Sequence, residues 1–282
     1  MRKVVQWLFL LLSNSNFPGF LSGRIYKGGM KAVCVPGLNC YSCPGAVASC
    51  PLGALQAVLG AAGYRFSFYV TGFLVGFGVL FGRFICGFLC PFGLLQEFLH
   101  KIPFYRVKKL WRGFLYVKYV LLAVLVVGLP LLVRNFADLG DPAFCKYVCP
   151  AGTLTAGLPL LAANPSLRGA AGWLFTLKLT AAAAVIIGCL AAYRFFCKVL
   201  CPLGAFYGLF NKATLYRLRL EEKNCAHCGA CAKICKMAVD PSREPDSPEC
   251  IRCGDCVRVC RFAALHAGFF CRPHAKGEGM KI

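Results

Sequence analysis

Acidic residues are scarce in this chain. Its 282 residues include 11 Asp and Glu against 32 Lys and Arg, and only Glu97, Asp138 and Asp141 come before residue 220. A basic excess indicates nucleic-acid binding when the basic residues gather on one soluble face. Here they stand at the ends of long apolar stretches, where such residues help to orient membrane helices. We therefore expect membrane lipid, and no nucleic acid, among the partners.

Histidine is also rare, and several cofactor motifs are missing. None of His100, His227, His266 and His274 lies in an apolar stretch, and no Cys-x2-Cys-His site occurs, so haem is not expected. The chain has no Gly-x-Gly-x-x-Gly or Walker-type phosphate loop, which argues against bound NAD, FAD or ATP. Quinone has no dependable sequence signature, so it stays open as a further cofactor.

Cysteine, by contrast, is abundant, with 20 residues. Near the C-terminus two runs share the spacing Cys-x2-Cys-x2-Cys-x3-Cys. This is the ligand pattern of a bacterial ferredoxin with two 4Fe-4S clusters, in which the fourth Cys of each run ligates the other cluster. The pattern assigns one cluster to Cys225, Cys228, Cys231 and Cys260, and the other to Cys250, Cys253, Cys256 and Cys235.

The two runs depart from the ferredoxin pattern in one respect. The Pro that usually follows the fourth Cys is replaced by Lys236 and Arg261, which removes no ligand. Zinc is the alternative metal, because Cys-x2-Cys pairs also build zinc sites. Two complete four-Cys runs fit iron-sulfur better, so we predict that the chain transfers electrons and needs no catalytic residue that makes or breaks bonds.

Long apolar stretches dominate the rest of the chain, which is 58% hydrophobic. Three of them are long enough to cross a hydrocarbon core of ~30 Å as a helix: residues 64–85, 114–133 and 172–192. A fourth, residues 4–22, is interrupted by Ser and Asn at 13–16. It follows Arg2 and Lys3 as a secretory signal would, but no small-residue cleavage site comes after it. We interpret it as an uncleaved first span.

The basic residues also predict an orientation. The segment after the second span is rich in Lys and Arg, at positions 101, 106, 108, 109 and 112. The segment after the third span has only Arg134, Lys146 and Arg168, together with two aspartates. Basic loops stay in the cytoplasm. We therefore expect the N-terminus, residues 86–113 and the ferredoxin on the cytoplasmic side of a prokaryotic inner membrane, and residues 23–63 and 134–171 outside.

A second Cys motif, Cys-Pro-x-Gly, occurs four times, starting at Cys50, Cys90, Cys149 and Cys201. Pro suits the first turn of a helix, so each copy predicts a thiolate at the N-terminus of a short half-helix, where the helix dipole favours negative charge. The copies alternate with the spans, so the chain consists of two halves, each with one outer and one inner site.

Pairing the copies by side gives two further sets of four thiolates. The inner set is Cys86, Cys90, Cys197 and Cys201, enough for a 4Fe-4S cluster between the halves. The outer set has Cys145 and Cys149 plus two from Cys34, Cys40, Cys43 and Cys50, of which we choose Cys43 and Cys50. The alternatives are buried free thiols and outer disulfides. Cys189 and Cys271 are interpreted as structural.

These motifs together resemble those of the NapH-type membrane ferredoxins, which are relatives of the NosR-type proteins. The resemblance is carried by residues 37–56, Cys86-Gly-Phe-Leu-Cys-Pro-Phe-Gly, Phe196-Cys-Lys-Val-Leu-Cys-Pro-Leu-Gly and the ferredoxin runs, and it covers nearly the whole chain. It implies an inner-membrane electron-transfer protein, often described as a quinol dehydrogenase serving a reductase outside the cytoplasm. The chain differs by its additional Cys at 34, 40, 43, 145 and 149.

The predicted fold is a mainly α membrane protein with about four transmembrane helices and Cys-Pro half-helices in two pseudo-symmetric halves. Residues 1–219 form this part, residues 220–266 an α+β ferredoxin domain with two 4Fe-4S clusters, and residues 267–282 a tail. The expected function is electron transfer between the ferredoxin head and membrane clusters, a quinone or redox partner proteins on one or both faces. The alternatives are a maturation or redox-sensing protein and, last, a transporter built from inverted repeats.

Overall fold

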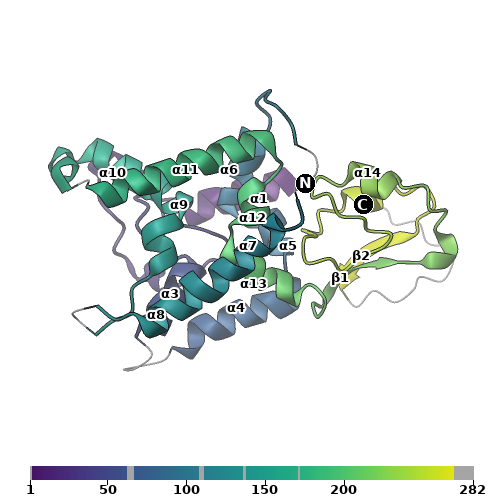
Figure 1. The fold of residues 1–282 in the computed structure, drawn as a ribbon, viewed down its shortest axis with the longest axis horizontal. Helices are drawn as coiled ribbons and strands as arrows, with labels where there is room; N and C mark the ends of the chain where they lie inside the picture. The colour runs from purple at the N-terminus through teal and green to yellow at the C-terminus, as the bar shows by residue number, and fades with distance from the viewer. Residues whose placement is uncertain (1, 62–66, 108–110, 136–137, 171, 270–282) are drawn as a thin grey trace.

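The structure is a computed structural model that describes residues 2–61, 67–107, 111–135, 138–170 and 172–269. It is elongated, with a helical body at one end and a small head at the other (Figure 1). The body contains, in chain order, α1 Arg2–Ser13, α2 Pro18–Ser22, η1 Gly29–Ala32, α3 Pro51–Gly60, α4 Phe68–Phe81, α5 Phe84–Phe88, α6 Pro91–Leu99, α7 Phe114–Leu121, η2 Leu122–Gly128, α8 Leu129–Leu132, η3 Phe144–Val148, α9 Pro150–Gly152, η4 Thr153–Gly157, α10 Leu158–Ala163, η5 Pro165–Ala170, α11 Trp173–Ala191, α12 Phe195–Val199 and α13 Pro202–Phe210.

Two helices of the body are long and apolar enough to cross a membrane. One is the continuous helix Phe114–Leu132, formed by α7, η2 and α8, and the other is α11; each has 19 residues. At about 1.5 Å per residue such a helix is about 28 Å long, close to the thickness of a hydrocarbon core. Only 17% of the apolar stretch of each helix is buried within the protein. Their apolar side chains therefore face outward, as they do in helices surrounded by lipid.

The prediction of four spans is not confirmed, because the other two segments form shorter helices. Helix α4 has 14 residues and ends at Gly82, whose φ of +54° breaks the helix; residues 62–66 before it lie outside the described part. Helix α1 ends at Ser13, where Ser13 Oγ donates to Phe9 O (2.7 Å) and Asn14 Nδ2 to Leu10 O (3.2 Å). These side chains bond backbone carbonyls that would otherwise accept helical hydrogen bonds. They belong to the Ser and Asn residues that interrupt the apolar stretch at positions 13–16.

Each of the four Cys-Pro sites begins a helix, as its residues predict. The Cys is the extended residue before the helix and the Pro is its first residue, in α3, α6, α9 and α13. All four of these cysteines, at 50, 90, 149 and 201, are buried. The half-helices therefore direct four Cys-bearing helix N-termini into the interior of the body.

The head consists of a two-stranded sheet and two short helices. Strand β1 Tyr216–Leu220 pairs antiparallel with β2 Leu265–Phe269, with Tyr216 opposite Phe269 and Leu220 opposite Leu265. Between the strands lie η6 Glu222–Asn224, α14 Ala230–Ile234 and α15 Asp255–Val259. The head thus extends from residue 216 to 269, slightly beyond the predicted residues 220–266.

Buried polar side chains attach the head to the body. Arg252 of the head donates to Asn211 O and Thr214 Oγ1, in the segment that follows α13, and to Tyr216 O at the start of β1. From the body, Arg83 Nη1 bonds Glu249 Oε2 (2.8 Å), and Lys118 of α7 pairs with the same carboxylate. Burial opposes ionisation of Glu249, but Arg83 and Lys118 outweigh it and lower the pKa of this carboxyl. The head is therefore docked through matched buried charges.

Candidate metal centres

The two Cys runs of the head have the same local conformation, 25 residues apart. His227 and Arg252 are left-handed (φ +49° and +51°), and so are Ala238 and Ala263 (+59° and +48°) and Gly229 and Gly254 (+70° and +78°). Alternating right- and left-handed residues turn successive backbone N–H groups toward one concave side, an arrangement common around iron-sulfur clusters. Two such N–H groups point at sulfur, from Arg252 to Cys250 Sγ (3.4 Å) and from Ala264 to Cys260 Sγ (3.3 Å).

Two cavities of the head bring together the predicted ligand sets. One is lined by Cys225, Cys228, Cys231 and Cys260. The other is lined by Cys235, Cys250, Cys253 and Cys256. Each cavity therefore receives three cysteines from one run and the fourth from the other, which is the crossed arrangement that the sequence predicts.

The second head site is the more enclosed of the two. Burial, followed by the neighbouring thiols of Cys250, Cys253 and Cys235, raises the pKa of Cys256 to about 12. Burial also raises the pKa of Cys250 to about 11. Free thiols here are therefore protonated at neutral pH, and binding of iron by thiolate would release protons. In the first site Cys228 is exposed, so this site reaches the surface of the head.

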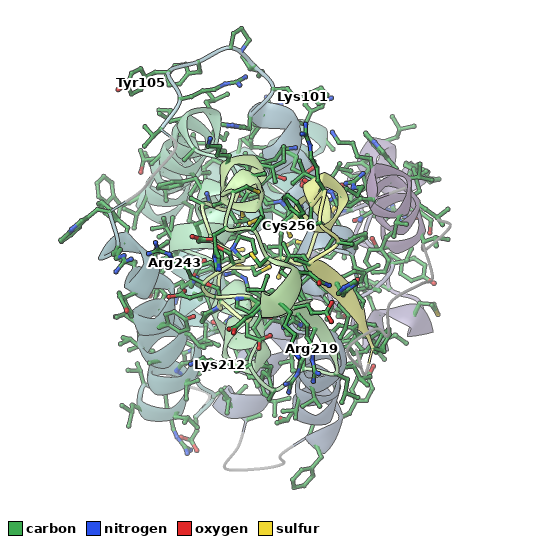
Figure 2. The ribbon with its side chains drawn as sticks, turned by 90° about the vertical axis from the view of Figure 1, so that its right-hand side faces the viewer. Lys101, Tyr105, Lys212, Arg219, Arg243 and Cys256 are labelled. Carbon is green, nitrogen blue, oxygen red and sulfur yellow. The ribbon has the colours of Figure 1, made fainter. Side chains whose placement is uncertain are left out.

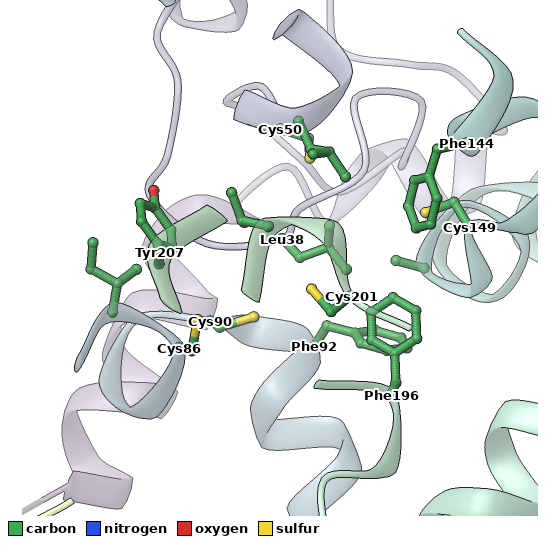
Figure 3. Close-up of a cluster of buried hydrophobic side chains, with 14 of the residues drawn as sticks. Leu38, Cys50, Cys86, Cys90, Phe92, Phe144, Cys149, Phe196, Cys201 and Tyr207 are labelled. Atoms are coloured by element: carbon green, nitrogen blue, oxygen red, sulfur yellow. The ribbon is translucent and has the colours of Figure 1, made fainter. Parts of the chain in front are cut away.

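The inner set of four cysteines also converges within the body. Cys86 belongs to α5, Cys197 to α12, and Cys90 and Cys201 precede α6 and α13. All four are buried. The thiol of Cys201 interacts electrostatically with those of Cys86, Cys90 and Cys197, and Cys90 does so with Cys86 and Cys197. Figure 3 shows Cys86, Cys90 and Cys201 around one common space.

Two fully buried arginines cross between the halves at this inner set. Arg83 and Arg194 each stand three residues before the first cysteine of their own half, Cys86 and Cys197. Arg83 Nη2 donates to Cys197 O (2.8 Å), and Arg194 Nη1 donates to Cys86 O. Each arginine therefore holds the cysteine loop of the other half. Their two positive charges would offset the negative charge that four thiolates bring to a 4Fe-4S cluster.

Two glutamines extend this symmetry to the sulfurs. Gln96 Nε2 donates to Cys197 Sγ (3.0 Å), and Gln56 Nε2 donates to Cys145 Sγ (3.2 Å). Each glutamine stands six residues after the Cys of a Cys-Pro-x-Gly copy and reaches the first cysteine of the facing copy. Hydrogen bonds to sulfur adjust the reduction potential of an iron-sulfur cluster. The same device therefore occurs at the inner and the outer sites.

The predicted outer set is only partly brought together. Cys145 and Cys149 interact electrostatically with Cys50 and with Cys40. Cys43, which the sequence analysis preferred, instead has its sulfur 4.0 Å from Asn14 Oδ1. Cys40 lies against the other half, since a Cβ added to Gly152 would stand 3.7 Å from Cys40 Sγ. Cys34 lies within electrostatic range of Cys50.

One aromatic residue lies between the inner and outer sets. Tyr207 of α13 is completely buried, and its hydroxyl donates to Pro36 O (3.1 Å). It interacts electrostatically with Cys86 and Cys90 of the inner set and with Cys50 and Cys34 on the outer side. Figure 3 shows Tyr207 beside the inner cysteines, with Cys50 and Cys149 farther along the body. The two sets are therefore neighbours within one core.

Several of these residues were missed by the sequence analysis, although their spacing carries a signal. Arg83 looked like an ordinary charge at the end of a span, yet the pattern Arg-x2-Cys-x3-Cys-Pro-x-Gly recurs at Arg194. The pattern Cys-Pro-x-Gly-x-x-Gln likewise occurs twice, at Gln56 and Gln96.

The donor sets fit iron-sulfur clusters. Thiolates are the soft ligands that such clusters use, four for each 4Fe-4S cluster. A cubane cluster places its four thiolates on four different irons, so they stand farther apart than four thiolates on one zinc ion. Within the described residues, no group of three or more His, Cys, Asp or Glu side chains is spaced to hold a single metal ion, and all 19 described cysteines are free thiols.

The family model of a 4Fe-4S binding domain matches residues 62–112, 119–163 and 174–221, together about half of the chain. Each matched segment contains one Cys-x3-Cys-Pro site, at 86 and 90, at 145 and 149, and at 197 and 201. The matches therefore fall on the membrane-type Cys sites and lie outside the Cys runs of the head. Ferredoxin-type iron-sulfur binding thus extends into the helical body.

Three curated relatives are similar over parts of the chain. The methylamine utilization ferredoxin-type protein MauN of Methylorubrum extorquens is 28% identical over 156 residues, which is 40% of this chain and 53% of that protein. MauN of Paracoccus denitrificans is 44% identical over 43 residues, 15% of each chain. An uncharacterized protein of Methanocaldococcus jannaschii is 31% identical over 55 residues, 20% of this chain and 22% of that protein. This chain thus spans about half the length of the first relative and less of the others. No solved structure matches it.

Proposed function

This chain belongs to the 4Fe-4S binding domain family, and from that premise we propose that it is a membrane-bound electron-transfer protein of the NapH/NosR type. Electrons pass between the two clusters of the head and the inner cluster of the body, and from there to a quinone or to a partner outside the cytoplasm. The chain's task is to hold these centres close together and to adjust their potentials through burial and hydrogen bonds to sulfur.

The observation that carries this proposal is the contact between the second head site and the inner site. The loop of Cys250 lies directly on α5, because a Cβ added to Gly87 would stand 2.8 Å from Ile251 O. On the other side, Lys198 Nζ donates to Lys236 O (3.1 Å). Lys198 adjoins Cys197 of the inner set, and Lys236 adjoins Cys235 of the head. Electron tunnelling weakens steeply with distance, so this docking favours transfer.

The burial of the sites supports an order of transfer. The first head site has the exposed Cys228, whereas Cys256 of the second site and all four inner cysteines are buried. A soluble redox partner would therefore exchange electrons at the first head site. The second head site and then the inner site would follow, because the head and the helical body lie one after the other along the long axis of the molecule (Figure 1).

We infer that the head faces the cytoplasm of a prokaryotic cell, with the body in the inner membrane. Viewed from the head end, Cys256 lies near the centre, with Lys101 above it and Lys212 and Arg219 below it (Figure 2). The hydrogen bond from Val107 N to Ala191 O (2.9 Å) joins the basic segment to the head-side end of α11. The basic residues at this end of the molecule support the cytoplasmic orientation of the head.

We assign quinone exchange to an apolar cavity of about 590 Å³ between α1, α6 and α10. Its volume lies in the usual range for small-molecule sites. Leu95, Phe98 and Leu154 are among its apolar lining residues, and Cys40 and Phe92 bring it next to the outer and inner sets. A photoreactive quinone analogue should label this lining, and excess quinone should suppress the labelling; labelling confined to other segments would contradict the assignment.

The transfer route is tested by removing the inner site alone. Cys86→Ser combined with Cys197→Ser should abolish electron transfer from a reductant on the head side of sealed vesicles to an acceptor enclosed within them. The EPR signals of the reduced head should remain. Cys189→Ser is the matched control, because Cys189 is equally buried and lies 3.6 Å from Gln96 Oε1 but is outside the four-Cys set. Undiminished transfer in the double variant would refute the proposal.

A further inference from the structure

The outer site has the same construction as the inner one. Cys50 and Cys149 precede α3 and α9 with extended backbones, and both are buried. Cys145 lies in η3, one turn before Cys149. Gln56 holds Cys145 in place, since Gln56 Nε2 donates to Cys145 Sγ (3.2 Å) and Gln56 Oε1 accepts from Phe144 N (3.0 Å). Gln96 makes the equivalent bonds at the inner site, to Cys197 Sγ (3.0 Å) and from Cys197 N (3.4 Å).

The two glycines of the outer Cys-Pro-x-Gly copies show which cysteine sulfur of the other half lies against each copy. A Cβ added to Gly53 would lie 3.8 Å from Cys145 Sγ, and one added to Gly152 would lie 3.7 Å from Cys40 Sγ. Each half therefore presents a glycine surface to a sulfur of the other half. Cys40 therefore lies against α9, and Cys145 lies against Gly53 of α3.

Electrostatic contacts select the same four residues. Cys149 interacts with Cys145, Cys40 and Cys50, and Cys145 interacts with Cys50 and Cys40. Cys40 in turn interacts with Cys50. Cys43 interacts with Cys40, and its sulfur lies 4.0 Å from Asn14 Oδ1.

We propose that Cys40, Cys50, Cys145 and Cys149 hold a further 4Fe-4S cluster at the end of the body away from the head, with Cys40 rather than Cys43 as the fourth ligand. Gln56 is a positioning residue, which donates its N–H to the Cys145 sulfur. The inference rests on the proposed function and deepens it, because the outer cluster would extend the route from the inner site across the body.

The outer and inner sites differ in the charge around them. The inner set has two buried guanidinium groups, from Arg83 and Arg194. The outer set has ammonium groups nearby instead, since Lys178 interacts with Cys145, and Lys31 interacts with Cys43 and with Cys40. Lys31 Nζ is held by Tyr41 O (2.7 Å) and Ala46 O (2.6 Å), which ties it to the loop that carries Cys40.

The test compares two cysteines of one loop. Full-length protein, purified without oxygen and labelled with iron-57, is measured for iron, acid-labile sulfide and Mössbauer spectrum. The unmodified chain should contain about sixteen irons, Cys40→Ala about twelve, and Cys43→Ala about sixteen. Loss in Cys43→Ala but not in Cys40→Ala would overturn the ligand assignment, and equal iron in all three proteins would overturn the site. Unchanged EPR signals of the head serve as the check on folding.

Two additional variants keep the proposal testable if Cys40→Ala does not fold. Gln56→Leu keeps all four ligands but removes the N–H that stabilises the reduced cluster, so one midpoint potential should fall while the others stay. No shift in any centre would overturn the role of Gln56 and the cluster beside it. Cys86→Ala with Cys197→Ala should lose about four different irons, so failure of the inner site and failure of the outer site give separate results.

Discussion

The substitution Arg83→Met should loosen the docked head without removing any cluster ligand. Arg83 is fully buried and donates to Pro248 O (2.6 Å), Glu249 Oε2 (2.8 Å) and Cys197 O (2.8 Å). It therefore joins the head to the second half of the body through three hydrogen bonds. Methionine fills similar volume but leaves two carbonyls unpaired, and leaves Lys118 alone to neutralise the Glu249 carboxylate.

The size of the effect follows from this loss. Removing one partner of a buried ion pair typically costs about 3–5 kcal/mol. Since 1.4 kcal/mol is a factor of ten, the docked state should become less favoured by a factor of about 10²–10⁴. The exposed pair of Arg243 and Asp240, 3.6 Å apart, provides the matched control. Arg243→Met should change the same equilibrium by less than about 1 kcal/mol.

Hydrogen exchange measures this docking, through the amides of residues 247–252 and 211–216 at the interface. Arg83→Met should raise their exchange rates and slow electron transfer from head to body, with iron content unchanged. Glu249 also pairs with Lys118, so Glu249→Gln alone should raise the same exchange rates, and the double variant should cost less than the sum of the two single variants in a double-mutant cycle. Equal exchange in Arg83→Met and the unmodified chain would refute the docking role of this ion pair.

Two further predictions concern the inner site and the contact beside it. Gln96→Leu removes the 3.0 Å hydrogen bond to Cys197 Sγ, so potentiometric EPR should show a lower midpoint potential for the inner cluster alone; an unchanged or higher potential would contradict the role of this N–H. Gly87→Ala places a Cβ 2.8 Å from Ile251 O, which should cost about 1–3 kcal/mol of docking and slow transfer from head to body while all iron is kept. Gly76→Ala on α4, where nothing lies within 4 Å of the added Cβ, should transfer electrons at the original rate, and equal rates in both variants would rule out the contact as a control of transfer.

The sequence predicted the features that depend on local spacing. Three closely spaced cysteines of one run line each head site together with the fourth cysteine of the other run, because a short loop has few ways to surround one cavity. The Pro after Cys90 and Cys201 likewise determined where α6 and α13 begin, since Pro lacks the N–H that an interior helical position needs.

The features that the sequence did not predict depend on tertiary direction. Cys40 and Cys43 are three residues apart in one loop, and only the path of that loop decides which sulfur faces Cys149. In the sequence Arg83 and Arg194 resemble charges at the ends of spans. Only the tertiary structure shows that the guanidinium group of each one donates to a backbone carbonyl of the other half. The lengths of α1 and α4 were overestimated, because hydropathy continues through Ser13 and Gly82 while the helical backbone stops there.

The crossed arginines and shared ligand sets have a consequence for how the protein is made. Cys86 and Cys90 emerge from the ribosome more than one hundred residues before Cys197 and Cys201, and Cys40 and Cys50 likewise precede Cys145 and Cys149. No half of the body contains four facing thiols on its own. With the ligand sets proposed above, iron loading of the body would wait until both halves are synthesised and packed together, and the completed clusters would mark a fully assembled body.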